Sequence, residues 1–166
     1  MNRIDQYLIH AVPIGLVATA FMDLFALARR RVSGTPLPDY ALVGRWIAHM
    51  RRGRFRHAAI AKTPAVRTER GLGWAVHYAT GIVFAGALLV VAGIGWARDP
   101  TLLPALAIGI GSVAAPFLLM QPGMGAGIAA RRTADPTTAR VRSLVAHAVF
   151  GVGLYLAGSV LRFVAA

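Results

Sequence analysis

The first apolar block of the chain reads YLIHAVPIGLVATAFMDLFALA over residues 7–28, and three arginines, Arg29 to Arg31, follow it directly. About 20 apolar residues are enough for a helix to cross the hydrocarbon layer of a membrane. Because the arginines are typical of a stop-transfer anchor, we expect this helix to be retained rather than removed as a signal peptide.

Further blocks of this kind span residues 72–97, 101–121 and 144–161. Lipid forms no hydrogen bonds with an open backbone, so apolar blocks of this length are expected to be helical. Only Arg98, Asp99 and Pro100 separate the second block from the third, which predicts a tight hairpin. The predicted fold is therefore an all-α integral membrane protein, a single domain over residues 1–166 with four transmembrane helices in an antiparallel bundle.

The basic residues are distributed unevenly among the connections. Eleven Lys and Arg residues lie between the first and second spans, one between the second and third, and four between the third and fourth. Cytoplasmic loops carry an excess of Lys and Arg. The pattern predicts that the first and third connections are cytoplasmic and that both termini lie outside.

Composition narrows the chemistry further. With 57% hydrophobic and 14% charged residues, the chain has too little polar material to cover a soluble globule. The net charge of +12 flanks the spans, which favours anionic membrane lipids as partners over nucleic acid. Since there is no cysteine, a metal would need His, Asp, Glu, Met or amide oxygen ligands.

The connection between the first two spans is predicted to contain a basic amphipathic helix over residues 40–61. Such a helix should lie along the cytoplasmic leaflet. A solvated loop helix that merely satisfies the charge bias is the alternative. The residues predicted at the membrane surface are Arg45, Trp46, Arg51, Arg52, Arg54 and Arg56.

Each predicted span carries a polar group near its cytoplasmic end: Asp23, His77, Gln121 and His147. An ionisable side chain inside a membrane is costly enough to suggest a function. His77 and His147 share helix faces with small residues, which are expected to pack against neighbouring helices. We therefore predict that these four side chains form a site for a ligand or a proton.

A short internal repetition relates the spans in pairs. Met22-Asp23 resembles Met120-Gln121, and His77-x-x-x-Gly81 resembles His147-x-x-x-Gly151. Two similar hairpins would place Asp23 opposite Gln121 and His77 opposite His147. Chance similarity between short apolar helices is the alternative.

Several chemical roles fit the polar groups. Asp23, His77 and His147 are a competent ligand set for a divalent metal, and two facing histidines could hold a haem. The same groups could handle a proton, or could only fasten the helices together by hydrogen bonds. His49 and His57 are candidate additional ligands, with solvated loop residues as the alternative.

Residues 123–127, GMGAG, resemble a phosphate loop but lack its Gly-Lys-Ser/Thr ending. No nucleotide is therefore expected. A broken helix end after Pro122 explains these glycines better.

Six segments of the chain resemble a bacterial family of small membrane proteins that is known only as a domain of unknown function (DUF 2938). These segments are ATAFMDL (18–24), DYALVGRW (39–46), GRFRH (53–57), GWAVHY (73–78), PFLLMQP (116–122) and HAVFG (147–151). The resemblance implies a four-span protein of the bacterial inner membrane, and it implies no particular activity.

The leading interpretation is a non-enzymatic membrane protein that binds a metal ion, a proton or a small solute, as a transporter or an accessory subunit. A bundle of four spans is slim, so a homo-oligomer is expected if it transports. The first alternative is a histidine-dependent metalloenzyme acting on a lipid or quinone, although five histidines are few for such chemistry. The second alternative is a structural or lipid-organising protein.

Overall fold

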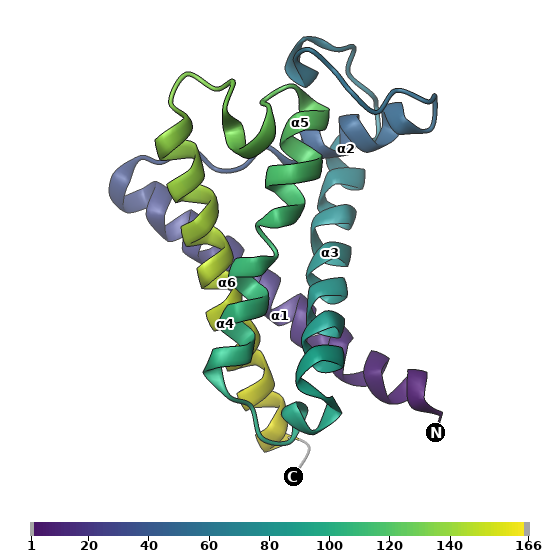
Figure 1. The fold of residues 1–166 in the computed structure, drawn as a ribbon, viewed down its shortest axis with the longest axis vertical. Coiled ribbons are helices and arrows are strands. Elements are labelled where there is room, and N and C mark those ends of the chain that lie inside the picture. The colour runs from purple at the N-terminus through teal and green to yellow at the C-terminus, as the bar shows by residue number, and fades with distance from the viewer. Residues whose placement is uncertain (1, 165–166) are drawn as a thin grey trace. The chain divides into compact units, whose positions relative to one another are not determined.

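The computed structural model describes residues 2–164, and every regular element in that range is helical, as predicted (Figure 1). The α-helices are α1 (Arg3–Ser33), α2 (Tyr40–Met50), α3 (Glu69–Ala92), α4 (Leu102–Gly111), α5 (Gln121–Met124) and α6 (Pro136–Val164). Shorter segments join them: the 3₁₀ turns η1 (Ile60–Lys62), η2 (Ile94–Ala97) and η4 (Ile128–Ala130), and the π-helical η3 (Pro116–Met120).

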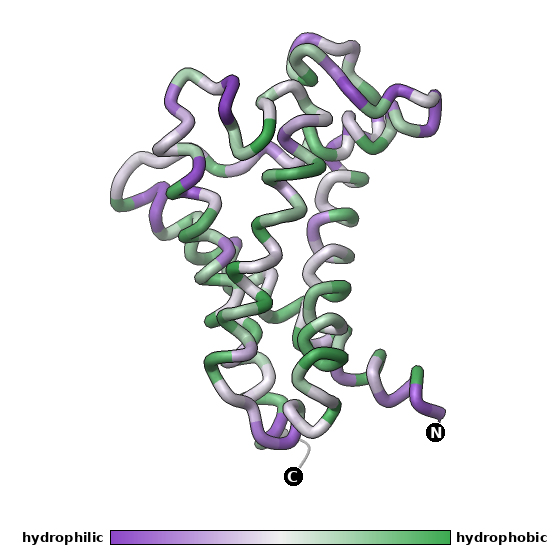
Figure 2. Tube along the Cα trace, viewed as in Figure 1, coloured by the Kyte–Doolittle hydropathy of each residue, from purple (hydrophilic) through white to green (hydrophobic). Residues whose placement is uncertain are grey.

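Four segments within residues 2–164 are long and apolar enough to cross a membrane. They are Arg3–Ser33, Glu69–Ala92, Leu102–Met124 and Pro136–Phe163. Between 17% and 33% of the most apolar part of each is buried, so most of that part is at least partly exposed. Figure 2 shows these helices coloured mainly as hydrophobic. The expected number of apolar helices of membrane-spanning length is thus confirmed.

Two helices have other bounds than the spans predicted for them. α6 begins at Pro136 rather than at 144, because the Asp135 carboxylate accepts a hydrogen bond from the Thr138 N–H at 3.0 Å and proline suits the first helical position. α3 ends at Ala92 rather than at 97. Gly93 there adopts a left-handed φ of +83°, a conformation that only glycine adopts readily, and η2 follows.

The predicted amphipathic helix over residues 40–61 was wrong in length, because α2 ends at Met50. The backbone N–H groups of Arg52 and Arg54 both donate to the carbonyl oxygen of His49, at 3.0 and 3.2 Å. Gly53 supplies the left-handed φ of +73° that this reversal requires. The chain therefore turns back after α2 instead of continuing as a helix.

The contacts group the chain into two compact units. Unit 1 comprises Met1–Leu37, Tyr78–Ser112 and Val145–Ala166, and unit 2 comprises Pro38–His77 and Val113–Leu144. Unit 2 has twelve Lys and Arg residues against three Asp and Glu, a net charge of +9, whereas unit 1 has six against three. Most of the positive charge therefore belongs to unit 2.

Glycines let the helices of unit 1 approach closely. A Cβ atom added to Gly15 of α1 would lie 2.7 Å from the backbone nitrogen of Ile82 in α3. One added to Gly109 of α4 would lie 2.8 Å from the carbonyl oxygen of His147 in α6. Such close contacts strengthen packing between helices that have no hydrophobic effect to draw them together in lipid. Around them lie fully buried side chains, among them Ile14, Leu88, Leu89 and Leu154.

The two glycines of the predicted internal repeat occupy similar positions in this packing. Gly81 meets the Thr19 side chain of α1, and a Cβ added to Gly151 would lie 3.0 Å from the Ala105 carbonyl oxygen of α4. Each of these glycines therefore lies at a crossing with another helix of unit 1. The repeat also predicts that Asp23 faces Gln121 and that His77 faces His147. These pairings stay predictions, because the two members of each pair belong to different units.

Candidate functional site

In unit 2, α2 is held against the start of α3 by a glycine on each helix. A Cβ atom added to Gly44 would meet the Glu69 carbonyl oxygen, and one added to Gly73 would meet the carbonyl oxygen of Tyr40. The two backbones therefore touch. This contact positions the other residues of α2 relative to α3.

Arg45 of α2 and Glu69 of α3 form a two-pronged ion pair. Arg45 Nε donates to Glu69 Oε2 and Arg45 Nη2 donates to Glu69 Oε1, both at 2.8 Å. Arg45 Nη1 also donates to the Thr63 carbonyl oxygen at 3.0 Å. The hydrogen bond to Glu69 raises the pKa of the Arg45 guanidinium above its ordinary value. The Arg45 and Glu69 side chains are only 12% and 15% exposed. Their hydrogen bonds hold together three segments of unit 2, namely α2, the segment at Thr63 and the start of α3.

Trp46 connects α2 to the segment after it and to α5. Its indole Nε1 donates to the Phe55 carbonyl oxygen at 2.9 Å. A Cβ atom on Gly123 would lie 2.6 Å from that same nitrogen, so the glycine leaves room for the indole. Within unit 2, then, Trp46 is a packing residue.

Of the six residues predicted at the membrane surface, Arg45 and Trp46 make contacts inside unit 2. The other four are exposed and follow the end of α2: Arg51, Arg52, Arg54 and Arg56. Their contact with lipid stays a prediction.

His49 and His57 are the predicted residues that unit 2 brings together. Their ring centroids are 5.3 Å apart, with the edge of one ring toward the face of the other. His49 is 5% exposed, and its Nε2 lies 3.3 Å from the Pro64 carbonyl oxygen. A carbonyl only accepts, so Nε2 carries the proton and Nδ1 presents a lone pair.

This pair of histidines contains buried polar atoms that have no hydrogen-bond partner among the described protein groups. His49 Nδ1 and both ring nitrogens of His57 are buried, and no described protein group hydrogen-bonds to them. The Oε1 atom of Gln121 in unit 2 is in the same situation. Gln121 lies two residues before Gly123, whose carbonyl oxygen accepts from the His57 backbone N–H at 2.9 Å. Since unpaired buried polar atoms are costly, they suggest a binding role.

The remaining predicted site residues have partners that sequence reasoning missed. In unit 1 the Tyr78 hydroxyl of α3 donates to Asp23 Oδ2 of α1 at 3.1 Å. In unit 2 the His77 ring stacks on Tyr40 with centroids 4.0 Å apart. In the sequence these partners are indicated only by their positions. Tyr78 follows His77 directly, and Tyr40 begins α2.

His147 of α6 is paired with Ser112, at the end of α4. The Ser112 hydroxyl donates to the Gly109 carbonyl oxygen at 2.6 Å and lies 2.6 Å from His147 Nδ1. Because a hydroxyl has a single proton, Ser112 accepts from an Nδ1–H of His147. Polar contacts thus join α1 to α3 and α4 to α6 in unit 1.

Replacing Tyr78 with phenylalanine is expected to lower the free energy of unfolding by about 1 kcal/mol, because the Asp23 carboxylate loses a hydrogen-bond donor. Unfolding of the protein in detergent, followed by circular dichroism, measures the change. Tyr155→Phe is the matched control in unit 1, since its hydroxyl makes no hydrogen bond with a described residue. Equal losses in the two variants would show that the Tyr78–Asp23 bond contributes nothing.

No group of three or more His, Asp and Glu side chains is arranged to hold a metal ion among residues 2–164. Asp23 and His147 belong to unit 1, and His77 and Gln121 belong to unit 2. Their convergence on one site stays a prediction.

Four apolar helices of membrane-crossing length, with basic residues concentrated in two of the three connections, are the features of a multi-pass membrane protein. More particularly, the chain belongs to the family described as "Protein of unknown function (DUF2938)", whose model matches residues 12–161. This match confirms the resemblance carried by the six segments. No curated protein and no solved structure matches the chain.

Proposed function

We propose that this membrane protein binds a small oxyacid anion, a carboxylate or a phosphate, together with a proton, at His49 and His57. The observation that carries the proposal is the set of three buried ring nitrogens without protein partners in this pair. The site would serve a transporter or an accessory subunit that handles small acids.

The charge of unit 2 favours an anion over a metal cation. A net charge of +9 concentrates anions near the unit and opposes the entry of a divalent cation. The lone pair on His49 Nδ1 can receive a proton, after which its N–H can donate to an anionic oxygen. His57 supplies a further N–H donor, and histidine exchanges protons readily near neutral pH.

The same charge supports an orientation. Positive residues accumulate on the cytoplasmic side of multi-pass proteins of the bacterial inner membrane. We therefore place the first and third connections on the cytoplasmic side, with both termini in the periplasm. In this orientation, the histidine pair would receive its anion from the cytoplasmic side or release it there.

Calorimetric titration of the purified protein with phosphate and with acetate tests the proposal. Titration in two buffers of different ionisation enthalpy shows whether protons are taken up. We expect binding with proton uptake, and an affinity at least about tenfold lower in His49→Gln and His57→Gln, because each loses a charge-assisted hydrogen bond. Tyr155→Phe in unit 1, which changes neither histidine and lies outside the histidine pair, is the control and should bind normally.

The other outcomes identify the alternatives. Binding of Zn²⁺ but of neither anion, lost in the same two variants, would replace the anion site with a metal site. If neither an anion nor Zn²⁺ binds, the melting temperature of the His57→Phe variant distinguishes a packing role of the pair from a binding role. Because the buried ring nitrogens are unpaired, this variant should melt at a higher temperature than the wild type if the pair is a binding site. A lower melting temperature, with no anion bound, would mean that the histidines only hold unit 2 together.

A further inference from the structure

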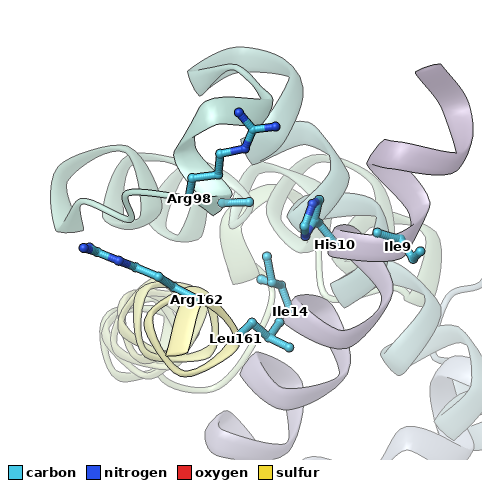
Figure 3. A pocket seen from close by; sticks show the side chains of 7 residues that line it. Ile9, His10, Ile14, Arg98, Leu161 and Arg162 are labelled. Atoms are coloured by element: carbon cyan, nitrogen blue, oxygen red, sulfur yellow. The ribbon is translucent and has the colours of Figure 1, made fainter. Parts of the chain in front are cut away.

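Unit 1 contains a pocket that is remote in sequence from the histidine pair. Its volume is about 560 Å³, within the usual range for ligand pockets. Aliphatic side chains from α1 and α6 line it, namely Ile9, Ile14 and Leu161. Three nitrogen-bearing side chains from three elements complete it: His10 of α1, Arg98 after η2, and Arg162 of α6 (Figure 3).

The pocket carries more positive than negative charge. Arg162 Nη1 donates to Asp99 Oδ1 at 2.9 Å, but these side chains are 51% and 82% exposed, so the pair is weak. Arg98 forms no ion pair with any described residue. One arginine is therefore unneutralised, and the other is held by a carboxylate that a stronger anion could displace.

The pocket combines this charge with a hydrocarbon surface. Arg98 lies in the short connection between the candidate spans Glu69–Ala92 and Leu102–Met124, so we expect it at the edge of the hydrocarbon layer. Next to it, α1 exposes Leu8, Ile9 and Val12, at 53%, 58% and 38%. Basic groups at headgroup depth beside exposed aliphatic residues match a molecule with an anionic head and an apolar tail.

We propose that this pocket binds the headgroup of an anionic phospholipid. Its phosphate accepts hydrogen bonds from Arg98 and Arg162, and its acyl chains lie against the exposed aliphatic face of α1. A free anion in solution would gain nothing from Ile9, Ile14 and Leu161. The proposal is independent of the anion site in unit 2.

Native mass spectrometry of the full-length protein, after exchange into micelles that contain phosphatidylglycerol or phosphatidylcholine, tests the proposal. We expect phosphatidylglycerol to be retained in preference to phosphatidylcholine. Its affinity should fall about fivefold in Arg98→Gln and again in Arg162→Gln, the usual contribution of one arginine near a membrane surface. Asp99→Asn should raise retention, because it releases Arg162 for the phosphate.

The control is Arg3→Gln, which removes an equal charge from an exposed position of α1 outside the pocket. It should retain the lipid normally, and melting curves should show that all variants are folded. Retention of phosphatidylglycerol by Arg98→Gln/Arg162→Gln at the wild-type level would overturn the proposal. So would equal retention of phosphatidylcholine, or displacement of the lipid by inorganic phosphate at millimolar concentration, which would identify a site for soluble anions.

Discussion

Arg45→Leu is expected to lower the free energy of unfolding by about 3 kcal/mol, because removing one partner leaves a poorly solvated charge on the other. Glu69 is only 15% exposed and would lose both of its 2.8 Å hydrogen bonds to the guanidinium. The Thr63 carbonyl oxygen would lose its donor as well. Unfolding in a titration with sodium dodecyl sulfate measures this loss.

A double-mutant cycle separates the ion pair from its surroundings. Glu69→Leu alone should also destabilise the protein, whereas Arg45→Leu/Glu69→Leu should lose less than the sum of the single changes, because no unpaired charge remains. Arg67→Leu removes an exposed arginine of the same unit and should change stability by no more than about 0.5 kcal/mol. A loss in Arg45→Leu no larger than in Arg67→Leu would rule out the structural role of the pair.

Gly109→Ala is expected to destabilise the protein by about 2 to 3 kcal/mol, because the added methyl group would overlap backbone atoms. Its Cβ would lie 2.5 Å from the Gly151 nitrogen and 2.8 Å from the His147 carbonyl oxygen, and backbone cannot rotate away as a side chain can. The Gly109 carbonyl oxygen also accepts from Ser112, so the shift should disturb the Ser112–His147 hydrogen bond. Melting in detergent measures the stability change.

Gly111→Ala provides a closely matched control, two residues further along α4. A Cβ atom there would have no neighbour within 4 Å. Alanine favours the helix over glycine, so this variant should be neutral or slightly more stable. Equal destabilisation by the two substitutions would mean that the contact between α4 and α6 is looser than the structure shows.

The apolar helices could be predicted because membrane-crossing length and hydropathy are local properties of the chain. A helix satisfies its own backbone hydrogen bonds, so an apolar run of about 20 residues is sufficient to predict one. The helix boundaries were harder to predict from the sequence, because they depend on single residues, such as Asp135 and Gly93, that cap or end a helix.

The pairing of His49 with His57 could not have been predicted in the same way. On the continuous helix expected over residues 40–61, eight residues separate side chains by about 12 Å along the axis. The reversal at Gly53 instead brings the ring centroids to 5.3 Å. The left-handed conformation of Gly53 therefore allows His49 and His57 to come together and form the candidate site.

Residue types and spacing alone predicted the four apolar helices of membrane-spanning length. They also located the polar residues within these helices and the positive charge. Tertiary structure alone decided the partners: Glu69 for Arg45, Tyr78 for Asp23 and Ser112 for His147. The physical reason is that hydropathy acts over one stretch of chain, whereas a hydrogen bond between helices depends on where their backbones cross. In this protein those crossings are set by glycines whose neighbours lie on other helices.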